Sequence, residues 1–209
     1  MKAPVTIALT IGLAFAVPSC AGTRFEISFP ASAHAAPVTG RVFLILAREP
    51  GTEPRFQQPV ELLGVDVKAV KPDQPAAIDG DTLGYPARTL AEVPPGDYFV
   101  QAVLNVYSEF HRSDGHTVWA HMDQWEGQQF EYSPGNLVSE PQRFHLDSAG
   151  GNLKVNLNRV IPPIPMPPDS EWVKRIKFES KLLTQFWGHP VYIGATVLLP
   201  KGYDAHRCV

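Results

Sequence analysis

Hydrophobic and polar residues alternate along several short stretches of this chain, which is the pattern of half-buried β-strands. In Asn152–Val160, Leu153, Val155 and Leu157 would face a core while the residues between them face water. Val42–Leu46 is apolar at every position, which is typical of a central strand covered on both faces. Together these patterns predict strands at Arg24–Phe29, Val38–Ala47, Leu62–Val70, Tyr98–Tyr107, Arg143–Leu146, Asn152–Val160, Trp172–Phe178 and Tyr192–Leu199.

Turn residues separate these stretches. Thr89–Val93 and Tyr98–Tyr107 flank Pro94–Asp97, a Pro-Pro-Gly-Asp sequence whose residues suit a tight turn. This arrangement predicts a β-hairpin in which the two flanking runs pair with each other.

A proline-rich segment divides the chain. Ile161–Pro168 contains five prolines, which cannot donate hydrogen bonds to a β-ladder and favour an extended linker. We therefore predict five parts: a signal peptide (1–21), an N-terminal strand and linker (22–37), a β-sandwich domain (38–160), the proline-rich linker (161–170) and the start of a further domain (171–209).

Composition supports a β-rich fold. The 209 residues include 21 Pro and 16 Gly, which helix interiors tolerate poorly. Short strands at this spacing favour a mainly β protein, an antiparallel β-sandwich of the immunoglobulin-like or a related type. The formal net charge of −3, without a basic cluster, argues against nucleic acid as a partner.

The first residues have the pattern of a signal peptide. Lys2 precedes Val5–Val17, an apolar run too short to span a bilayer comfortably. Cleavage after Ala21 would give an exported protein, periplasmic or extracellular, without a transmembrane span. In a second interpretation Cys20 is the lipidated first residue of an envelope lipoprotein and anchors the protein to a membrane. With the signal removed, Cys208 would have no partner for a disulfide.

The region between Asn105 and Asn136 is the richest in candidate site residues. Its tryptophans offer stacking surfaces, and its polar side chains offer hydrogen bonds, a combination that suits sugars or peptides. The candidate ligand-binding residues are Trp119, His121, Asp123, Trp125 and Glu126.

The same region allows two other interpretations. Imidazole and carboxylate groups bind metal ions, so His111, His116 and His121, together with Asp123, form a candidate metal site. However, His116 and His121 are separated by an odd number of positions, so their side chains would point to opposite faces of one strand. The plainest interpretation is a long hairpin loop whose polar residues hydrogen-bond locally.

Motifs of common enzyme classes are missing from the sequence. It contains no Gly-x-Ser-x-Gly, no His-Glu-x-x-His, no Cys-x-x-Cys and no phosphate-binding glycine loop. We therefore assign no catalytic residue and expect no cofactor.

The C-terminal stretch resembles a known enzyme family. Ala195–Asp204, ending in Leu-Leu-Pro-Lys-Gly-Tyr-Asp, resembles the opening strand and turn of the catalytic domain of putative esterases, the enterochelin esterase-like α/β-hydrolases. Trp172–Lys177 and Leu182–Gly188 resemble the entry region of exported members. Pro95–Ala102 and His121–Gly127 are similar to the β-rich segment that precedes the hydrolase fold.

This resemblance implies an accessory role. The family's nucleophile, acid and histidine would all lie beyond residue 209, which implies a truncated or frame-shifted product. We expect the non-catalytic N-terminal accessory β-sandwich of an exported esterase-like hydrolase, inactive in ester hydrolysis by itself. The alternative is a free-standing sandwich or lipoprotein that binds a carbohydrate or another envelope component.

Overall fold

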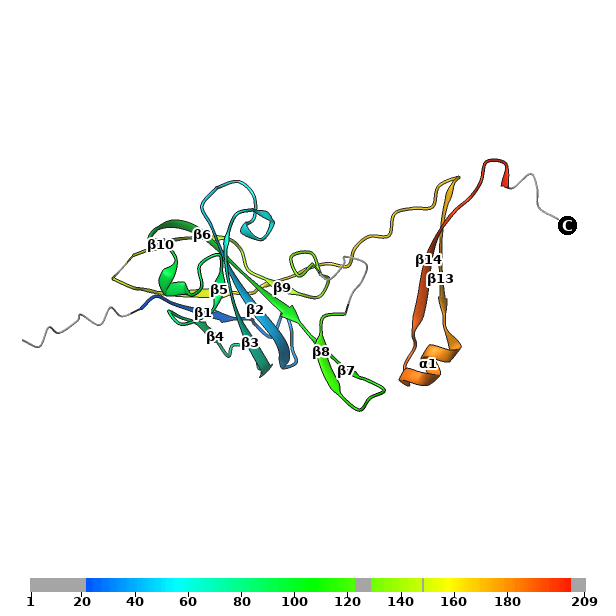
Figure 1. Cartoon of the computed structure of the whole chain (residues 1–209), viewed down its shortest axis with the longest axis horizontal. Coiled ribbons are helices and arrows are strands. Elements are labelled where there is room, and N and C mark those ends of the chain that lie inside the picture. Colours follow the sequence, from blue (N-terminus) through cyan, green and yellow to red (C-terminus); the bar gives the residue numbers. More distant parts are fainter. Residues whose placement is uncertain (1–21, 123–128, 148, 204–209) are drawn as a thin grey trace, which may run out of the picture. The chain divides into compact units, whose positions relative to one another are not determined.

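The computed structural model describes residues 22–122, 129–147 and 149–203, and most of its regular structure is β-strand (Figure 1). The chain divides into two compact units, Met1–Ile164 and Pro165–Val209. The division falls within the proline-rich segment, where no strand forms. The two units are called the sandwich unit and the hairpin unit below.

The larger sheet of the sandwich unit has seven strands, and all of its pairs are antiparallel. β6 and β2 lie at its centre and pair over most of their length. In order of pairing, its strands are β12 (Arg159–Val160), β9 (Leu137–Val138), β6 (Gly96–Val106), β2 (Val38–Ala47), β3 (Glu61–Val70) and β5 (Gly84–Tyr85), and β10 (Gln142–Leu146) also pairs with β6.

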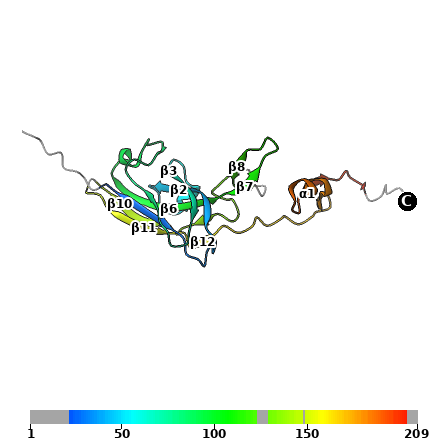
Figure 2. The ribbon, with the colours of Figure 1, turned by 90° about the horizontal axis from the view of Figure 1, so that it is seen from below.

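The smaller sheet has three strands. β1 (Arg24–Ser28) lies between β11 (Asn152–Asn156), with which it pairs in parallel, and β4 (Ala76–Ile78), with which it pairs antiparallel. Figure 2 shows β1 in blue beside β11 in yellow. β1 is therefore an integral part of the sandwich and forms the middle strand of this sheet.

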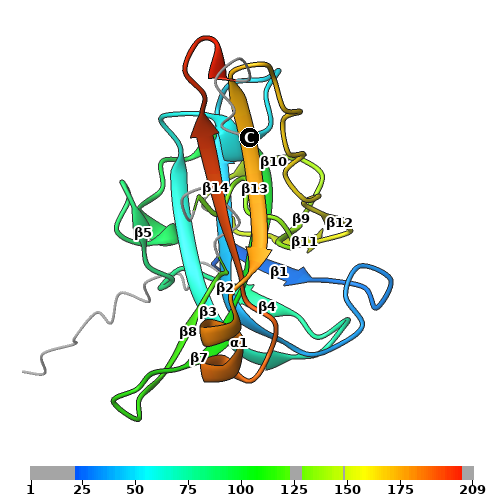
Figure 3. The same cartoon turned by 90° about the vertical axis from the view of Figure 1, so that its right-hand side faces the viewer.

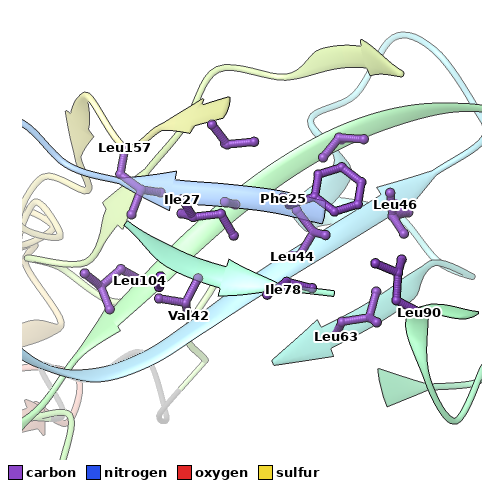
Figure 4. Packing of buried hydrophobic residues seen from close by; sticks show 14 of the residues in the cluster. Phe25, Ile27, Val42, Leu44, Leu46, Leu63, Ile78, Leu90, Leu104 and Leu157 are labelled. Carbon is purple, nitrogen blue, oxygen red and sulfur yellow. The ribbon is translucent and has the colours of Figure 1, made fainter. Parts of the chain in front are cut away.

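The main core lies between these two sheets. Phe25 and Ile27 of β1 and Ile78 of β4 pack with Leu44 of β2 and Leu104 of β6, and all five are buried (Figure 4). In β1, in β4 and in the first part of β2, every second residue is buried, as the alternating pattern predicts. The mainly β, antiparallel sandwich class is thus confirmed, while its immunoglobulin-like subtype stays a prediction.

The central strand β2 is covered on both faces, as its continuous apolar run indicates. Leu44 belongs to the main core, whereas its neighbour Ile45 joins a second cluster with Val103, Val138 and Ile161. The face of the seven-stranded sheet that carries this second cluster is called the outer face below.

The prediction of a β-hairpin around Pro94–Asp97 is wrong. Thr89–Val93 does not form a strand: Leu90–Glu92 is a 3₁₀ helix (η2), and β6 pairs with β2, β9 and β10 instead. Leu90 and Val93 are spaced by one helical turn, so a helical turn buries both side chains in the main core, which a strand would not do. Another 3₁₀ helix, η1, spans Pro54–Phe56.

Beside the sheets, β7 (Ser108–His111) and β8 (Thr117–Ala120) form a separate two-stranded hairpin (Figure 1). Its turn is Arg112–His116, in which the amide of Arg112 donates to the carbonyl of His116 at 2.8 Å. The interpretation of this region as a hairpin loop with local hydrogen bonds agrees with this structure.

The hairpin unit consists of β13 (Val173–Glu179), α1 (Lys181–Trp187) and β14 (Tyr192–Leu198), with the two strands antiparallel (Figure 3). Ser180 caps the helix by accepting from the amide of Leu183, and Gly188 ends it in the left-handed conformation (φ 71°). No helix in the described part of the chain is long and apolar enough to cross a membrane.

Candidate functional site

Trp119 is the predicted ligand residue that the structure leaves most accessible. It lies on β8 directly opposite Glu109 of β7, and 42% of its surface is exposed. Directly opposite residues of an antiparallel pair share a face, so Trp119 and Glu109 form one small exposed patch on the hairpin. This patch offers one aromatic face and one carboxylate.

His121 does not belong to that patch. Its side chain is buried, and its Nδ1 hydrogen-bonds to the carbonyl oxygen of Val106 at 2.8 Å. The remaining predicted ligand residues, Asp123, Trp125 and Glu126, lie outside the described residues, as does Cys20.

The structure does not bring the candidate metal ligands together. The Nδ1 of His111 contacts the Oγ1 of Thr117 at 3.1 Å, while His116 lies in the turn near Asp114 and His121 is buried beyond the end of β8. Among the described residues, no group of three His, Cys, Asp or Glu side chains could hold a metal ion. The three histidines therefore do not form a metal site within the described part of the chain, and Asp123 lies outside it.

A different aromatic pair was not anticipated from the sequence. Phe56, at the end of η1, stacks on Tyr132 with ring centroids 4.8 Å apart and an interplanar angle of 26°. The two side chains stay 38% and 50% exposed, respectively. We call this pair the aromatic platform.

A half-buried polar network fixes the residues beside the platform. The Oε2 of Glu53 accepts hydrogen bonds from the Nε of Arg55 and the Nε2 of Gln101, both at 2.8 Å, and from Arg159 at 3.1 Å. Gln101 is a fully buried polar residue of β6 that also donates to the carbonyl of Ser139 at 2.9 Å. The network thus joins η1 to the outer face of the sheet.

The pKa of Glu53 reflects this network. Burial alone would raise that pKa, but the hydrogen bonds from Gln101, Arg159 and Arg55 and the charge of Arg55 lower it overall. Glu53 therefore stays ionised and holds its donors in place at neutral pH. Arg159 also forms an ion pair with Glu140, with Nε and Oε1 2.9 Å apart but not aligned as a hydrogen bond.

The segment that carries Tyr132 is anchored on both sides. The Nη1 of Arg55 donates to the carbonyl of Glu131 at 2.6 Å, and Phe130 stacks on Phe43 of β2 with centroids 4.2 Å apart. The buried side chain of Asn136 accepts from the amide of Val106 at 2.9 Å and donates to the carbonyl of Phe130 at 3.0 Å. These contacts hold the backbone around Tyr132 while its ring remains open to solvent.

A surface depression of about 520 Å³ lies near β6 and β10. Six of its lining residues pair across these strands: Asp97 with His145, Tyr98 with Phe144 and Phe99 with Arg143. The Nδ1 of His145 and the Oδ1 of Asp97 are 2.6 Å apart, and this hydrogen bond with the Asp97 charge raises the pKa of His145. The depression thus contains an exposed histidine–aspartate pair.

The hairpin unit presents an unusual surface of its own. The strand register places Ile176, Phe178, Ile193 and Val197 on one face of the two strands, and each is exposed. Lys174 is the one charged residue of the paired positions on that face, which we call the apolar face. The opposite face is mixed: it carries polar and apolar side chains, namely Val173, Arg175, Lys177, Glu179, Tyr192, Thr196 and Leu198. In the hairpin unit, none of the described residues is buried.

Comparisons with known protein families, with curated proteins and with solved structures find no match to this chain.

Proposed function

We propose that this chain is the non-catalytic accessory region of an exported esterase-like hydrolase. In this proposal the sandwich unit is the accessory module, and the hairpin unit is the opening of the hydrolase domain. The enzyme as a whole would cleave an ester by serine acyl transfer, with the catalytic groups supplied by that domain.

The apolar face of the hairpin unit carries the proposal. An isolated two-stranded hairpin is at best marginally stable in water, and this one exposes Ile176, Phe178, Ile193 and Val197 on a single face. Covering the remaining exposed area of each such side chain contributes on the order of 1 kcal/mol. A hydrolase domain built onto β13 and β14 would supply the missing layer over this face.

The geometry of Ala195–Tyr203, the described part of the stretch that resembles the esterase family, is compatible with an opening strand and turn. Ala195–Leu198 lies in β14, and the amide of Tyr203 donates to the carbonyl of Pro200 at 3.1 Å to close the turn. Gly202 has a φ of 77°, which explains why glycine suits this position. Asp204 lies outside the described residues.

The catalytic part of the proposal is tested by an ester-hydrolysis assay. Acyl transfer needs a nucleophile, a base and oxyanion donors held together, and we assign none of these roles within the 209 residues. The purified chain should not hydrolyse p-nitrophenyl esters above background. Turnover blocked by a serine-reactive inhibitor would refute the assignment.

The accessory part is tested in the cells that make the protein. The envelope fraction is labelled with a fluorophosphonate probe, and the tagged chain is then recovered under native conditions. A labelled serine hydrolase, covalently continuous with the chain or bound to it, is expected in the recovered fraction. A recovered fraction without any labelled hydrolase would contradict the accessory role.

Two substitutions make this experiment specific for the hairpin unit. Ile176→Lys places a charge on the apolar face and should remove the labelled hydrolase from the recovered fraction. Thr196→Lys places the same charge on the opposite, mixed face and serves as the matched control. Equal recovery with both variants would show that the apolar face is not the contact.

The alternative proposal, a free-standing module that binds a carbohydrate or an envelope component, is supported by the exposure of Trp119. A glycan array would test it, with binding expected to fall in Trp119→Ala. Export and anchoring are tested by mass spectrometry of the mature N-terminus. A chain beginning at Gly22 would indicate signal cleavage, and an acylated Cys20 would indicate a lipoprotein.

A further inference from the structure

Two stacked aromatic rings that remain open to solvent are an unusual use of large apolar side chains. Phe56 and Tyr132 could each lower the free energy of folding by further burial, yet the structure keeps both at the surface. The Cζ of Arg55 lies 4.2 Å from the centroid of the Phe56 ring, so this ring is contacted by both a guanidinium and the Tyr132 ring. Tyr132 is the more exposed member of the pair.

The platform is pre-organised. Both of its segments are tied to the sheet through Arg55, which contacts Glu53, the carbonyl of Glu131 and the ring of Phe56. Asn136 fixes the other end of the segment that carries Tyr132. A rigid aromatic surface loses little conformational entropy when a ligand stacks on it.

The charges around the platform indicate which ligand it suits. Arg55 and Arg159 are both paired with Glu53, and Glu140 pairs with Arg159. Glu131 adds a further carboxylate on the segment that carries Tyr132. The surroundings thus offer hydrogen-bond donors and acceptors without a net positive charge, which disfavours an acidic ligand.

From these observations we propose that the aromatic platform is a binding site for a neutral sugar residue of a glycan. One face of a pyranose ring would stack on Tyr132, and sugar hydroxyls would hydrogen-bond to the exposed parts of Glu140 and Arg159. This site is separate from the predicted Trp119 patch and does not depend on the proposed link to a hydrolase.

The experiment is a titration of the ¹⁵N-labelled chain with soluble oligosaccharides at concentrations up to about 10 mM. The probes are neutral cello-, xylo-, manno- and chito-oligosaccharides, with oligogalacturonate as the acidic comparator. At least one neutral probe should shift the amide signals of residues 130–133 and the side-chain signals of Arg159 in a saturable manner. Oligogalacturonate should bind more weakly.

Variants assign the binding to the platform. Tyr132→Ala should weaken binding at least about fivefold, because it removes the stacking surface. Tyr132→Phe retains the ring and should bind within about twofold of the natural chain. Trp119→Ala is the matched control for an exposed aromatic residue elsewhere and should leave binding unchanged.

Three results would overturn the proposal. The first is that none of the neutral probes shifts these signals. The second is tighter binding of the acidic probe than of any neutral one. The third is binding that Tyr132→Ala leaves intact, including binding that only Trp119→Ala removes. Unchanged amide spectra away from the platform will show that each variant is folded.

Discussion

Glu53→Gln tests whether the polar network on the outer face stabilises the sandwich unit through its charge. The substitution keeps the size of the side chain and removes one negative charge. The amide can still present its oxygen at the position of Oε2, where Arg55 and Gln101 donate. Its NH₂ group would then replace Oε1 and face the Nη2 of Arg159, a donor that is 3.1 Å from Oε1.

The expected magnitude follows from these contacts. A hydrogen bond to a charged group contributes about 1.5–3 kcal/mol, but Glu53 is 27% exposed at its side chain and solvent screens part of that energy. Because Arg55, Gln101 and Arg159 keep a partner at Oε2 and only the bond to Oε1 is lost, we expect Glu53→Gln to lower the free energy of unfolding by about 1–2 kcal/mol at pH 7. Glu140→Gln, which changes an exposed carboxylate paired with Arg159, should cost less than about 0.5 kcal/mol.

The pH dependence gives the sharper test. The pKa of Glu53 is lower in the folded protein than the ordinary value of 4.5, so its stabilisation is present above that ordinary value. The stabilisation is lost as the pH falls through the lowered folded-state pKa, because the carboxyl is then protonated in both states. The difference between natural chain and variant should therefore shrink as the pH falls from 7 to about 3.

Urea unfolding followed by circular dichroism at several pH values measures this difference directly. Other carboxylates titrate in both proteins, so their contributions largely cancel in the comparison. A difference that stays constant from pH 7 to about pH 3 would refute the assigned role of the Glu53 charge. A difference near zero at every pH would show that the network does not stabilise the fold.

Three further predictions concern the sandwich unit. Leu44→Ala should lower the free energy of unfolding by about 2–5 kcal/mol, because Leu44 is fully buried. Leu83→Ala, at a side chain that is 70% exposed in the same unit, should change it by less than about 0.5 kcal/mol in the same urea experiment. Similar values would contradict the assigned core. Asp97→Asn should lower the pKa of His145 towards its ordinary value in an NMR titration, because the charge-assisted hydrogen bond and the charge of Asp97 raise it. An unchanged pKa would contradict the pairing. Asn136→Ala should cost about 1–3 kcal/mol in urea unfolding, since it leaves the amide of Val106 and the carbonyl of Phe130 without this partner; a neutral effect would show that other groups replace it.

Much of the fold could be predicted from hydrophobic periodicity. The run Val38–Ala47 is a strand with the predicted bounds, and its continuous apolar part is covered on both faces. The alternation in Asn152–Val160 also holds, since Val155 and Leu157 are buried and their neighbours are not. These patterns are informative because a sheet residue that faces a core repeats every second position.

Other parts depended on contacts that are distant in the sequence. The parallel pairing of β1 with β11 joins two strands that lie far apart in the sequence, and alternation within each strand contains no information about such a partner. In Thr89–Val93 the residues favour a strand, but burial of Leu90 and Val93 decides for a helical turn. Tertiary packing overrides local preference in this segment.

The candidate site was harder to predict than the fold. Sequence reasoning favoured the region around Trp119 because aromatic and polar residues are concentrated there. The aromatic platform combines Phe56 and Tyr132, which lie far apart in the sequence and meet only after η1 folds onto the outer face. The sequence contains one partial indication of the polar network beside the platform: Gln101 is a polar residue within a predicted strand whose neighbouring residues suit a core.

The two faces of the seven-stranded sheet explain why a binding surface is to be sought on the outer one. On the inner face, Leu44 and Leu104 are buried against the smaller sheet. On the outer face, the buried side chain of Gln101 hydrogen-bonds to Glu53 and to the carbonyl of Ser139. Burying such a polar side chain costs little free energy only when its hydrogen-bond partners are held in place. The same requirement that satisfies Gln101 therefore holds η1 in position, and with it the exposed ring of Phe56. Stability of the outer face and pre-organisation of the aromatic platform are thus consequences of one hydrogen-bond network.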